Sequence, residues 1–176
     1  NFIEIIPSTE IFVKMTAESH VILLSRELDN PLSGHTNKVS SINEAYKVTK
    51  PWGSEHWLTG NTPSCDCVLK YIRINAGTKT SLQVHMDKFE SNYLVSGQAI
   101  YTSSKEKFVG KNRQYPTFEQ AFNQGYVIDV SPLTIHQVQA LTDIVLIEAS
   151  TNHLDDVIRL QDDSGREDGR VSKEHQ

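Results

Sequence analysis

The chain has 176 residues, a length that suits one domain with a substantial hydrophobic core. Its formal net charge is −5, with 17 Lys and Arg against 22 Asp and Glu, and it has no basic block that would bind nucleic acid through phosphate contacts. No apolar run approaches the roughly 20 residues of a membrane-spanning helix, and the start lacks the pattern of a signal peptide. We therefore expect neither nucleic acid nor a membrane as a partner.

The chain contains two cysteines, Cys65 and Cys67. Two residues apart on a strand, their side chains would share one face without the geometry of an easy disulfide. We interpret them as small residues of a strand rather than as half of a metal site, because no second pair stands nearby. This cysteine usage is typical of a reducing compartment and predicts a cytoplasmic protein.

Short β-rich stretches separated by turn residues dominate the sequence. They are rich in Val, Ile, Tyr and Thr, and several alternate with a period near two. The expected strands are Phe2–Ile6, His20–Leu24, Ala45–Lys50, Glu55–Thr59, Val68–Ile74, Ser81–His85, Asn92–Val95, Ala99–Thr102, Tyr126–Val130, His136–Ala140 and Ile144–Ala149. Many short strands with regular turns predict an all-β sandwich or barrel.

The remaining segments complete the expected organisation. Phe118–Asn123 is read as one helical turn, and Asp155–Leu160 as a last strand in preference to a helical turn. Asp29–Ile42 is rich in polar residues and reads as a loop. We expect an N-terminal extension with β segments over residues 1–46, the main domain over residues 47–166, and a polar, flexible tail over residues 167–176.

One region carries the residues typical of a metal site. Gln83 and His85 are two apart, so they project from the same face of a strand. Glu90 follows after a short turn that could return it on a neighbouring strand, and His136, which opens a strand after Pro132, is the best fourth candidate. A mixed set of imidazole, carboxylate and amide oxygen suits a borderline or hard divalent cation.

The spacing of these residues resembles the first cupin motif. Gly77 is followed after five residues by Gln83, which replaces the motif's first histidine, and then by His85, Glu90 and Gly97 at the family's intervals. The resemblance implies an all-β cupin (RmlC-like) fold, a double-stranded β-helix or jelly-roll barrel, that holds one divalent metal ion.

The second cupin motif is reproduced less completely. Gly125 and His136 keep the motif's separation of eleven positions. Ser131, Leu133 and Ala140 stand where the motif has proline, glycine and asparagine.

Three segments are similar to the type II phosphomannose isomerases (mannose-6-phosphate isomerases). Their Gln-x-His zinc ligands match Ser81–His85, their Arg/Lys-Pro-Trp-Gly opening matches Lys50–Trp57, and their C-terminal signature matches Asp155–Arg166. The family's His-His-His-Arg-Ala-Glu segment differs here at residues 86–89. The resemblance covers residues 47–166 and implies Zn²⁺ as the first choice of metal, with Mn, Co, Ni or Fe as other choices.

The resemblance implies a sugar or sugar-phosphate substrate and an aldose–ketose isomerisation. Lys79 and Lys88 flank the expected ligands and would serve as the base if burial lowered their pKa, with a metal-bound water as a third option. Substrate contacts are assigned to Lys50, to Trp52 as a stacking or packing ring, and to two arginines that suit phosphate. These are Arg159 and Arg166, for which ion pairs with nearby aspartates are an equal alternative.

Two further functions stay open. One is another metal cupin, such as an iron dioxygenase, and the other is a non-catalytic carbohydrate-binding cupin that keeps its metal for stability. An N-terminal extension that pairs with a sheet edge is also compatible with a homodimer. The other histidines are read as structural or exposed: His20, His35, His56, His153 and His175.

Overall fold

The computed structural model describes residues 2–4, 38–59, 67–166 and 169–170. The expected strand His20–Leu24, the end of Phe2–Ile6 and Cys65 lie outside these residues. The chain divides into two compact units, Asn1–Ala45 and Tyr46–Gln176. This division falls beside the expected boundary between the extension and the main domain.

In the first unit, β1 (Phe2–Glu4) pairs antiparallel with β2 (Lys38–Ser40). The short 3₁₀ helix η1 (Ile42–Glu44) follows, because Ser41 and Glu44 form a capping box that satisfies its first N–H groups. The prediction of a loop over Asp29–Ile42 is therefore wrong for residues 38–40. Residues 29–37 lie outside the described part of the chain.

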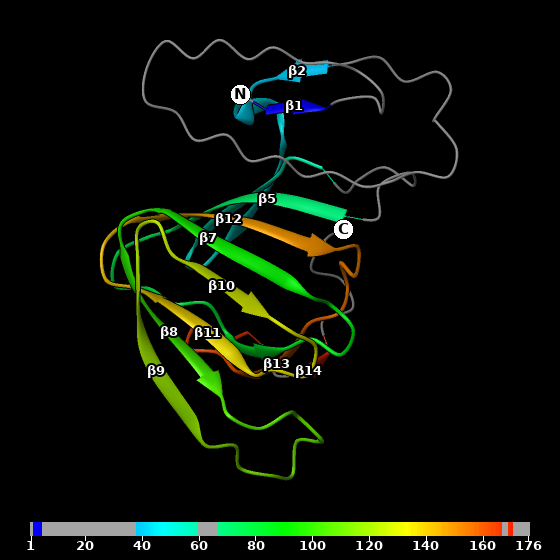
Figure 1. The fold of residues 1–176 in the computed structure, drawn as a ribbon, viewed down its shortest axis with the longest axis vertical. Helices are drawn as coiled ribbons and strands as arrows, with labels where there is room; N and C mark the ends of the chain where they lie inside the picture. Colours follow the sequence, from blue (N-terminus) through cyan, green and yellow to red (C-terminus); the bar gives the residue numbers. More distant parts are fainter. Residues whose placement is uncertain (1, 5–37, 60–66, 167–168, 171–176) are drawn as a thin grey trace. The chain divides into compact units, whose positions relative to one another are not determined.

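The second unit consists of two antiparallel sheets that face each other (Figure 1). The first has the strand order β10-β7-β12-β5-β4-β3, and the second has the order β14-β13-β6-β11-β8-β9. The first sheet comprises β3 (Tyr46–Lys50), β4 (Gly53–Trp57), β5 (Cys67–Ile74), β7 (Glu90–Ser96), β10 (Val127–Val130) and β12 (Ile144–Thr151). The second comprises β6 (Leu82–Val84), β8 (Gln98–Ser104), β9 (Thr117–Asn123), β11 (His136–Ala140), β13 (Ile158–Gln161) and β14 (Gly169–Arg170).

The all-β expectation is confirmed, with two local differences. The expected helical turn at Phe118–Asn123 is the strand β9, which pairs with β8 along its whole length from Gln98↔Asn123 to Ser104↔Thr117. Tertiary pairing thus overrides a weak local signal. The second difference lies in the expected flexible tail, where β14 pairs with β13.

The inner face of the first sheet changes from polar to apolar along its strands. Paired residues lie on one face, and the row Lys70↔Glu148↔Asn92 is polar whereas the next inner row, Ile72↔Leu146↔Leu94, is apolar. We call the interior around the first row the polar half; on this sheet its buried members are Lys70, Glu90, Asn92, Glu148 and Ser150. The apolar half is the core cluster of Trp52, Ile72, Ile74, Leu94, Ala99, Tyr101, Phe122, Val130, Val138, Ala140, Ile144 and Leu146.

The Lys-Pro-Trp-Gly segment forms the tight turn between β3 and β4. Gly53 has φ +152°, and a Cβ at this position would collide with the backbone oxygen of Arg73. Glycine is therefore required, because the turn lies directly against the neighbouring strand. The turn places Lys50 and Trp52, both buried, at the barrel interior.

No helix within the described residues is long and apolar enough to cross a bilayer.

Candidate metal centre

Three of the four expected ligands converge in the interior of the barrel. His85 directly follows β6, and His136 begins β11 of the same sheet, whereas Glu90 begins β7 of the opposite sheet. The Nε2 atoms of His85 and His136 lie 3.5 Å and 3.3 Å from the two carboxylate oxygens of Glu90. The candidate ligand atoms all lie within 4.8 Å of one another, and all three residues are buried.

Backbone contacts set the tautomers of the two histidines. The Nδ1 atom of His85 donates to the backbone oxygen of Asp156, and Nδ1 of His136 donates to that of Thr134 at 3.0 Å. Since a carbonyl oxygen only accepts, each Nδ1 carries a proton, and in the neutral ring each Nε2 then presents a lone pair to Glu90.

The Nε2 atom of His85 is buried and makes no hydrogen bond. A buried polar atom without such a partner is unusual in a folded protein. Backbone acceptors on the far ring nitrogen, with the near nitrogen aimed inwards, are the usual support of metal-binding histidines. The donor set therefore fits a divalent cation held by His85, Glu90 and His136.

Gln83 reaches the same point with its amide nitrogen. Its Nε2 atom lies 3.4 Å from Nε2 of His136, and its Oε1 accepts a hydrogen bond of 2.9 Å from the Ser81 hydroxyl. A half-turn of the amide would exchange these positions and present the oxygen to the centre. Gln83 is thus placed at the centre, and its part as a ligand stays a prediction.

Lys88 lies at the centre, but its pKa is raised, whereas a role as the base would require a lowered pKa. Its Nζ is 2.7 Å from Glu90 Oε2 and 2.7 Å from Glu148 Oε1. Burial lowers the pKa of Lys88, but the two carboxylates outweigh it and raise the pKa above the usual range. The lowered pKa required of a lysine base is therefore not found here, and Lys88 is a fixed cation.

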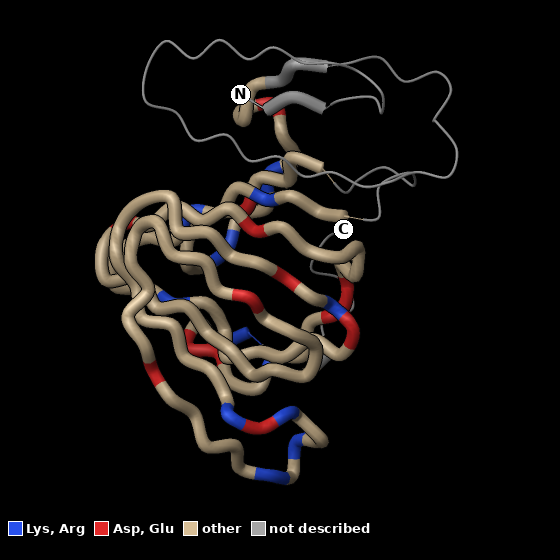
Figure 2. The backbone as a smooth tube through the Cα atoms, in the orientation of Figure 1, with Lys and Arg blue, Asp and Glu red and all other residues tan. Residues whose placement is uncertain are grey.

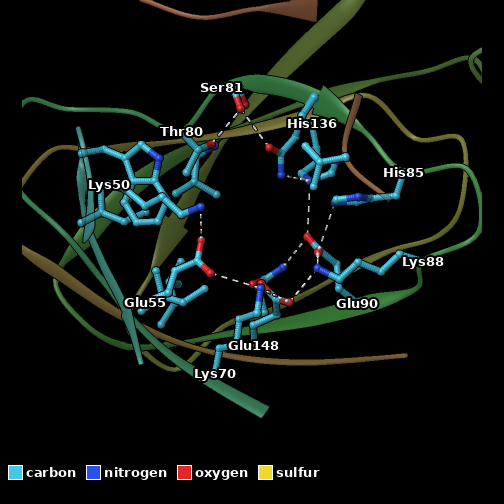
Figure 3. A pocket seen from close by; sticks show the side chains of 18 of the residues that line it. Lys50, Glu55, Lys70, Thr80, Ser81, His85, Lys88, Glu90, His136 and Glu148 are labelled. Carbon is cyan, nitrogen blue, oxygen red and sulfur yellow. Dashed lines mark hydrogen bonds and ion pairs between the residues drawn. The ribbon is translucent and has the colours of Figure 1, made fainter. Parts of the chain in front are cut away.

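Ion pairs continue from Lys88 across the barrel (Figure 3). Lys70 Nζ lies 3.8 Å from Glu148 and 3.2 Å from Glu55, and Lys50 Nζ lies 3.6 Å from Glu55. We call this set the buried charge chain; in order it contains Lys50, Glu55, Lys70, Glu148, Lys88 and Glu90.

The lysines keep two of these carboxyls ionised. Burial raises the pKa of Glu55, but the Lys70 and Lys50 cations outweigh it and lower the pKa to about 2. Burial likewise raises the pKa of Glu90, yet the Lys88 cation outweighs it and holds that pKa well below its usual range. The charge chain therefore maintains an anionic ligand at the centre.

A cavity of about 80 Å³ opens onto the centre and the charge chain. This volume holds several water molecules, and so it accommodates the reacting end of a small molecule. Lys50, Trp52 and Arg166, three of the four expected substrate contacts, line it.

Two expected residues are not among those that line the cavity. Lys79 forms an ion pair of 2.7 Å with Asp163. Arg159 is buried on β13, with its Cα in register with that of Gln83. Arg166, at the cavity, donates to Asp162 from Nε at 3.0 Å, as the ion-pair alternative anticipated.

The sequence analysis missed Glu55, Lys70 and Glu148, which make up half of the charge chain. A usable signal was present, because Lys70 shares its strand face with Ile72, and Glu148 shares its face with Leu146. A charged residue in phase with buried apolar residues points into the interior. The spacing alone does not reveal that these charges pair with each other, since they lie on different strands.

The turn before β11 departs from the cupin motif and is stabilised by hydrogen bonds to other segments of the chain. Leu133, in place of the motif's glycine, has φ 65°, which is unfavourable for a bulky side chain. Its N–H donates to the His85 backbone oxygen at 2.7 Å. Lys107, from the charged β8–β9 connection at the bottom of Figure 2, donates to Ser131, Pro132 and Thr134. These contacts fix the segment that leads to His136.

No protein-family model and no curated protein matches the sequence. Solved structures match its fold. The capsular polysaccharide assembling protein CapF from Staphylococcus aureus is 19% identical, with a TM-score of 0.55 over 67% of this chain and 33% of that chain. Oxalate decarboxylase from Bacillus subtilis is 17% identical, with a TM-score of 0.58 over 69% of this chain and 31% of that chain.

Oxalate decarboxylase from Lactobacillus farciminis is 16% identical, with a TM-score of 0.56 over 68% of this chain and 34% of that chain. The chain spans about a third of the length of each of these proteins. At these identities the likeness concerns the fold, and none of the three is a phosphomannose isomerase. The comparison confirms that the chain has the cupin β-barrel fold.

Proposed function

We propose that the chain is a metal-dependent aldose–ketose isomerase that acts on a small sugar or sugar phosphate, with Zn²⁺ as the best-suited cation. The observation that carries the proposal is the convergence of two histidine Nε2 lone pairs on an ionised, buried glutamate beside a cavity. Such nitrogen and oxygen donors are typical ligands of Zn²⁺. A cation bound there would polarise a substrate carbonyl.

The pocket suits a reaction that builds negative charge on substrate oxygens. In the isomerisation, a proton leaves C2 of the sugar and returns to C1, while the hydroxyl proton on O2 passes to O1. Lys88 is a permanent cation beside the centre, and it would stabilise the developing charge from a fixed position. Its role in this proposal is electrostatic, and it does not act as the base.

The wall of the cavity supports a polar substrate. Trp52 offers an apolar ring, and Lys50 and Arg166 offer positive charge. We assign substrate contacts to these three residues. A phosphate on the sugar would compete with Asp162 for the Arg166 guanidinium.

One observation favours a second candidate, a non-catalytic carbohydrate-binding cupin. Lys50, Lys70 and Lys88 all face glutamates in the charge chain. Glu55, with a pKa of about 2, would be a weak base. The residues of the charge chain could thus hold a ligand without moving its protons.

The decisive experiment is proton exchange measured by NMR in heavy water. Protein of known metal content would be incubated with mannose 6-phosphate and a panel of related sugars, with His85→Ala as the control that lacks a ligand. Metal-dependent deuterium entry at C1 or C2, absent in the control, would support the isomerase. Bound metal without exchange would favour the binding protein, or an iron dioxygenase if the native metal is iron.

A further inference from the structure

Asp156, outside the donor set, contacts the metal centre in two different ways. It is buried in the segment that leads into β13. Its backbone oxygen accepts the Nδ1 proton of His85. Its carboxylate accepts three backbone N–H groups, from Met86 at 3.1 Å, Asp87 at 2.6 Å and Lys88 at 2.9 Å.

The three N–H groups belong to the connection that sets the spacing of the ligands. Residues 86–89 link His85, which directly follows β6 of the second sheet, to Glu90, which begins β7 of the first. A shift of this connection would move the two ligands relative to one another. A carboxylate can accept several charge-assisted hydrogen bonds at once, so one side chain fixes three consecutive residues of the connection.

We propose that Asp156 is a positioning residue of the metal centre, which orients the His85 ring and holds the connection so that His85 and Glu90 face one cation. It does not contact the cation itself. The inference rests on the metal centre of the proposed function and is independent of which reaction, if any, the centre performs.

The chemistry of the contact predicts which substitution is informative. Asp156→Asn keeps the size of the side chain, but its amide offers one acceptor oxygen and turns an NH₂ group towards backbone N–H donors. Residues that orient metal ligands typically change metal affinity by about 10- to 100-fold when they are replaced. We expect a loss of Zn²⁺ affinity in this range.

The matched control is Asp143→Asn. Asp143 also accepts a backbone N–H through its carboxylate, from Ala76 at 2.8 Å. Neither residue is among those that line the cavity. This variant loses a similar hydrogen bond, so an effect on stability alone would appear in both variants, whereas the loss of affinity should appear only in Asp156→Asn.

The experiment measures Zn²⁺ affinity by chelator competition in the full chain, at a temperature where circular dichroism shows all variants folded. Long-range ¹H–¹⁵N NMR of the metal-free proteins would report the His85 tautomer. We expect the Nδ1–H form in the wild type and in Asp143→Asn, and a mixture in Asp156→Asn. If Asp156→Asn does not fold, Asp156→Glu, which keeps the charge on a longer side chain, replaces it.

Unchanged Zn²⁺ affinity together with an unchanged His85 tautomer in the Asp156 variant would overturn the proposal. An absence of isomerase activity would leave both measurements intact. If the wild type bound no Zn²⁺, the proposed centre would fail separately. The His85 tautomer of the metal-free wild type and Asp156 variant, measured by NMR, would then decide whether Asp156 orients the His85 ring.

Discussion

The polar and apolar halves of the barrel interior lie on the same strands and are built on different physical principles. Leu94, Leu146 and Ile72 form an apolar row, and stability there grows with the area removed from water, without directional requirements. At the adjacent inward-facing positions of the same three strands, Asn92, Glu148 and Lys70 form a polar row. There each buried group needs a partner at a defined distance.

The difference between the two halves indicates which of them serves the candidate site. Buried ion pairs seldom stabilise a protein beyond what apolar residues of the same volume would give, whereas breaking one is costly. A buried charge chain is therefore weak evidence for stability as its purpose. Its position beside His85 and His136 indicates that the polar half is maintained for the centre.

The largest expected effect comes from breaking the polar half at Lys88. Lys88→Met leaves Glu90 and Glu148 without the cation that lies 2.7 Å from each. We expect a loss of about 3–5 kcal/mol in the free energy of unfolding, measured by urea denaturation. The exposed Lys105→Met should change it by less than about 0.5 kcal/mol. Equal effects of the two substitutions would contradict the importance of the charge chain.

Truncation in the apolar half should cost slightly less and act through a cavity. Leu94 is fully buried, so Leu94→Ala is expected to reduce the free energy of unfolding by about 3 kcal/mol. Unlike Lys88→Met, it should leave Zn²⁺ affinity unchanged, as a titration of the folded variant would show. A large loss of affinity would mean that the two halves are not independent.

Acid should weaken the buried charge chain at Glu55. The pKa of Glu55 is about 2 in the folded chain and 4.5 as its ordinary value. Because the folded pKa is the lower one, the stabilisation is complete above pH 4.5 and is lost as the pH falls towards 2. It amounts to about 3 kcal/mol.

Urea denaturation between pH 6 and pH 3 would measure this contribution. The stability difference between the wild type and Glu55→Gln should narrow as the pH falls. For the exposed Glu119→Gln it should stay nearly constant. A constant difference for Glu55→Gln as well would contradict the lowered pKa.

The smallest effect is expected at Leu133, outside both halves, where backbone strain and side-chain packing oppose each other. Its left-handed backbone carries a strain of about 1–2 kcal/mol, while its side chain packs on the small cluster around Ile135. In Leu133→Gly the relief of strain offsets the lost packing, so thermal denaturation should show a net change under about 1 kcal/mol. A loss as large as that of Leu94→Ala would show that packing alone matters at this position.

Spacing along the chain predicted the residues that lie close in sequence. Gln83, His85 and Glu90 belong to one strand–turn–strand segment, and a fixed interval to a glycine identified His136. The buried charge chain could not be predicted in this way, because Glu55, Lys70 and Glu148 meet only through the strand order of the sheet.

The pKa of Lys88 is a second property that could not be predicted from the sequence. Burial alone would lower it, as the sequence reasoning assumed. The two carboxylates that reverse the shift come from β7 and β12, and their arrival depends on the tertiary fold.

The buried charge chain also determines how the protein should behave on an ion exchanger. Its three lysines and three glutamates cancel, so the formal net charge of −5 belongs to the rest of the chain. A divalent cation bound through histidine lone pairs and the already ionised Glu90 displaces no proton, so its two positive charges add directly to the net charge. Uptake of one cation should therefore appear as earlier elution from an anion-exchange column, a separation of loaded and empty protein that requires no substrate.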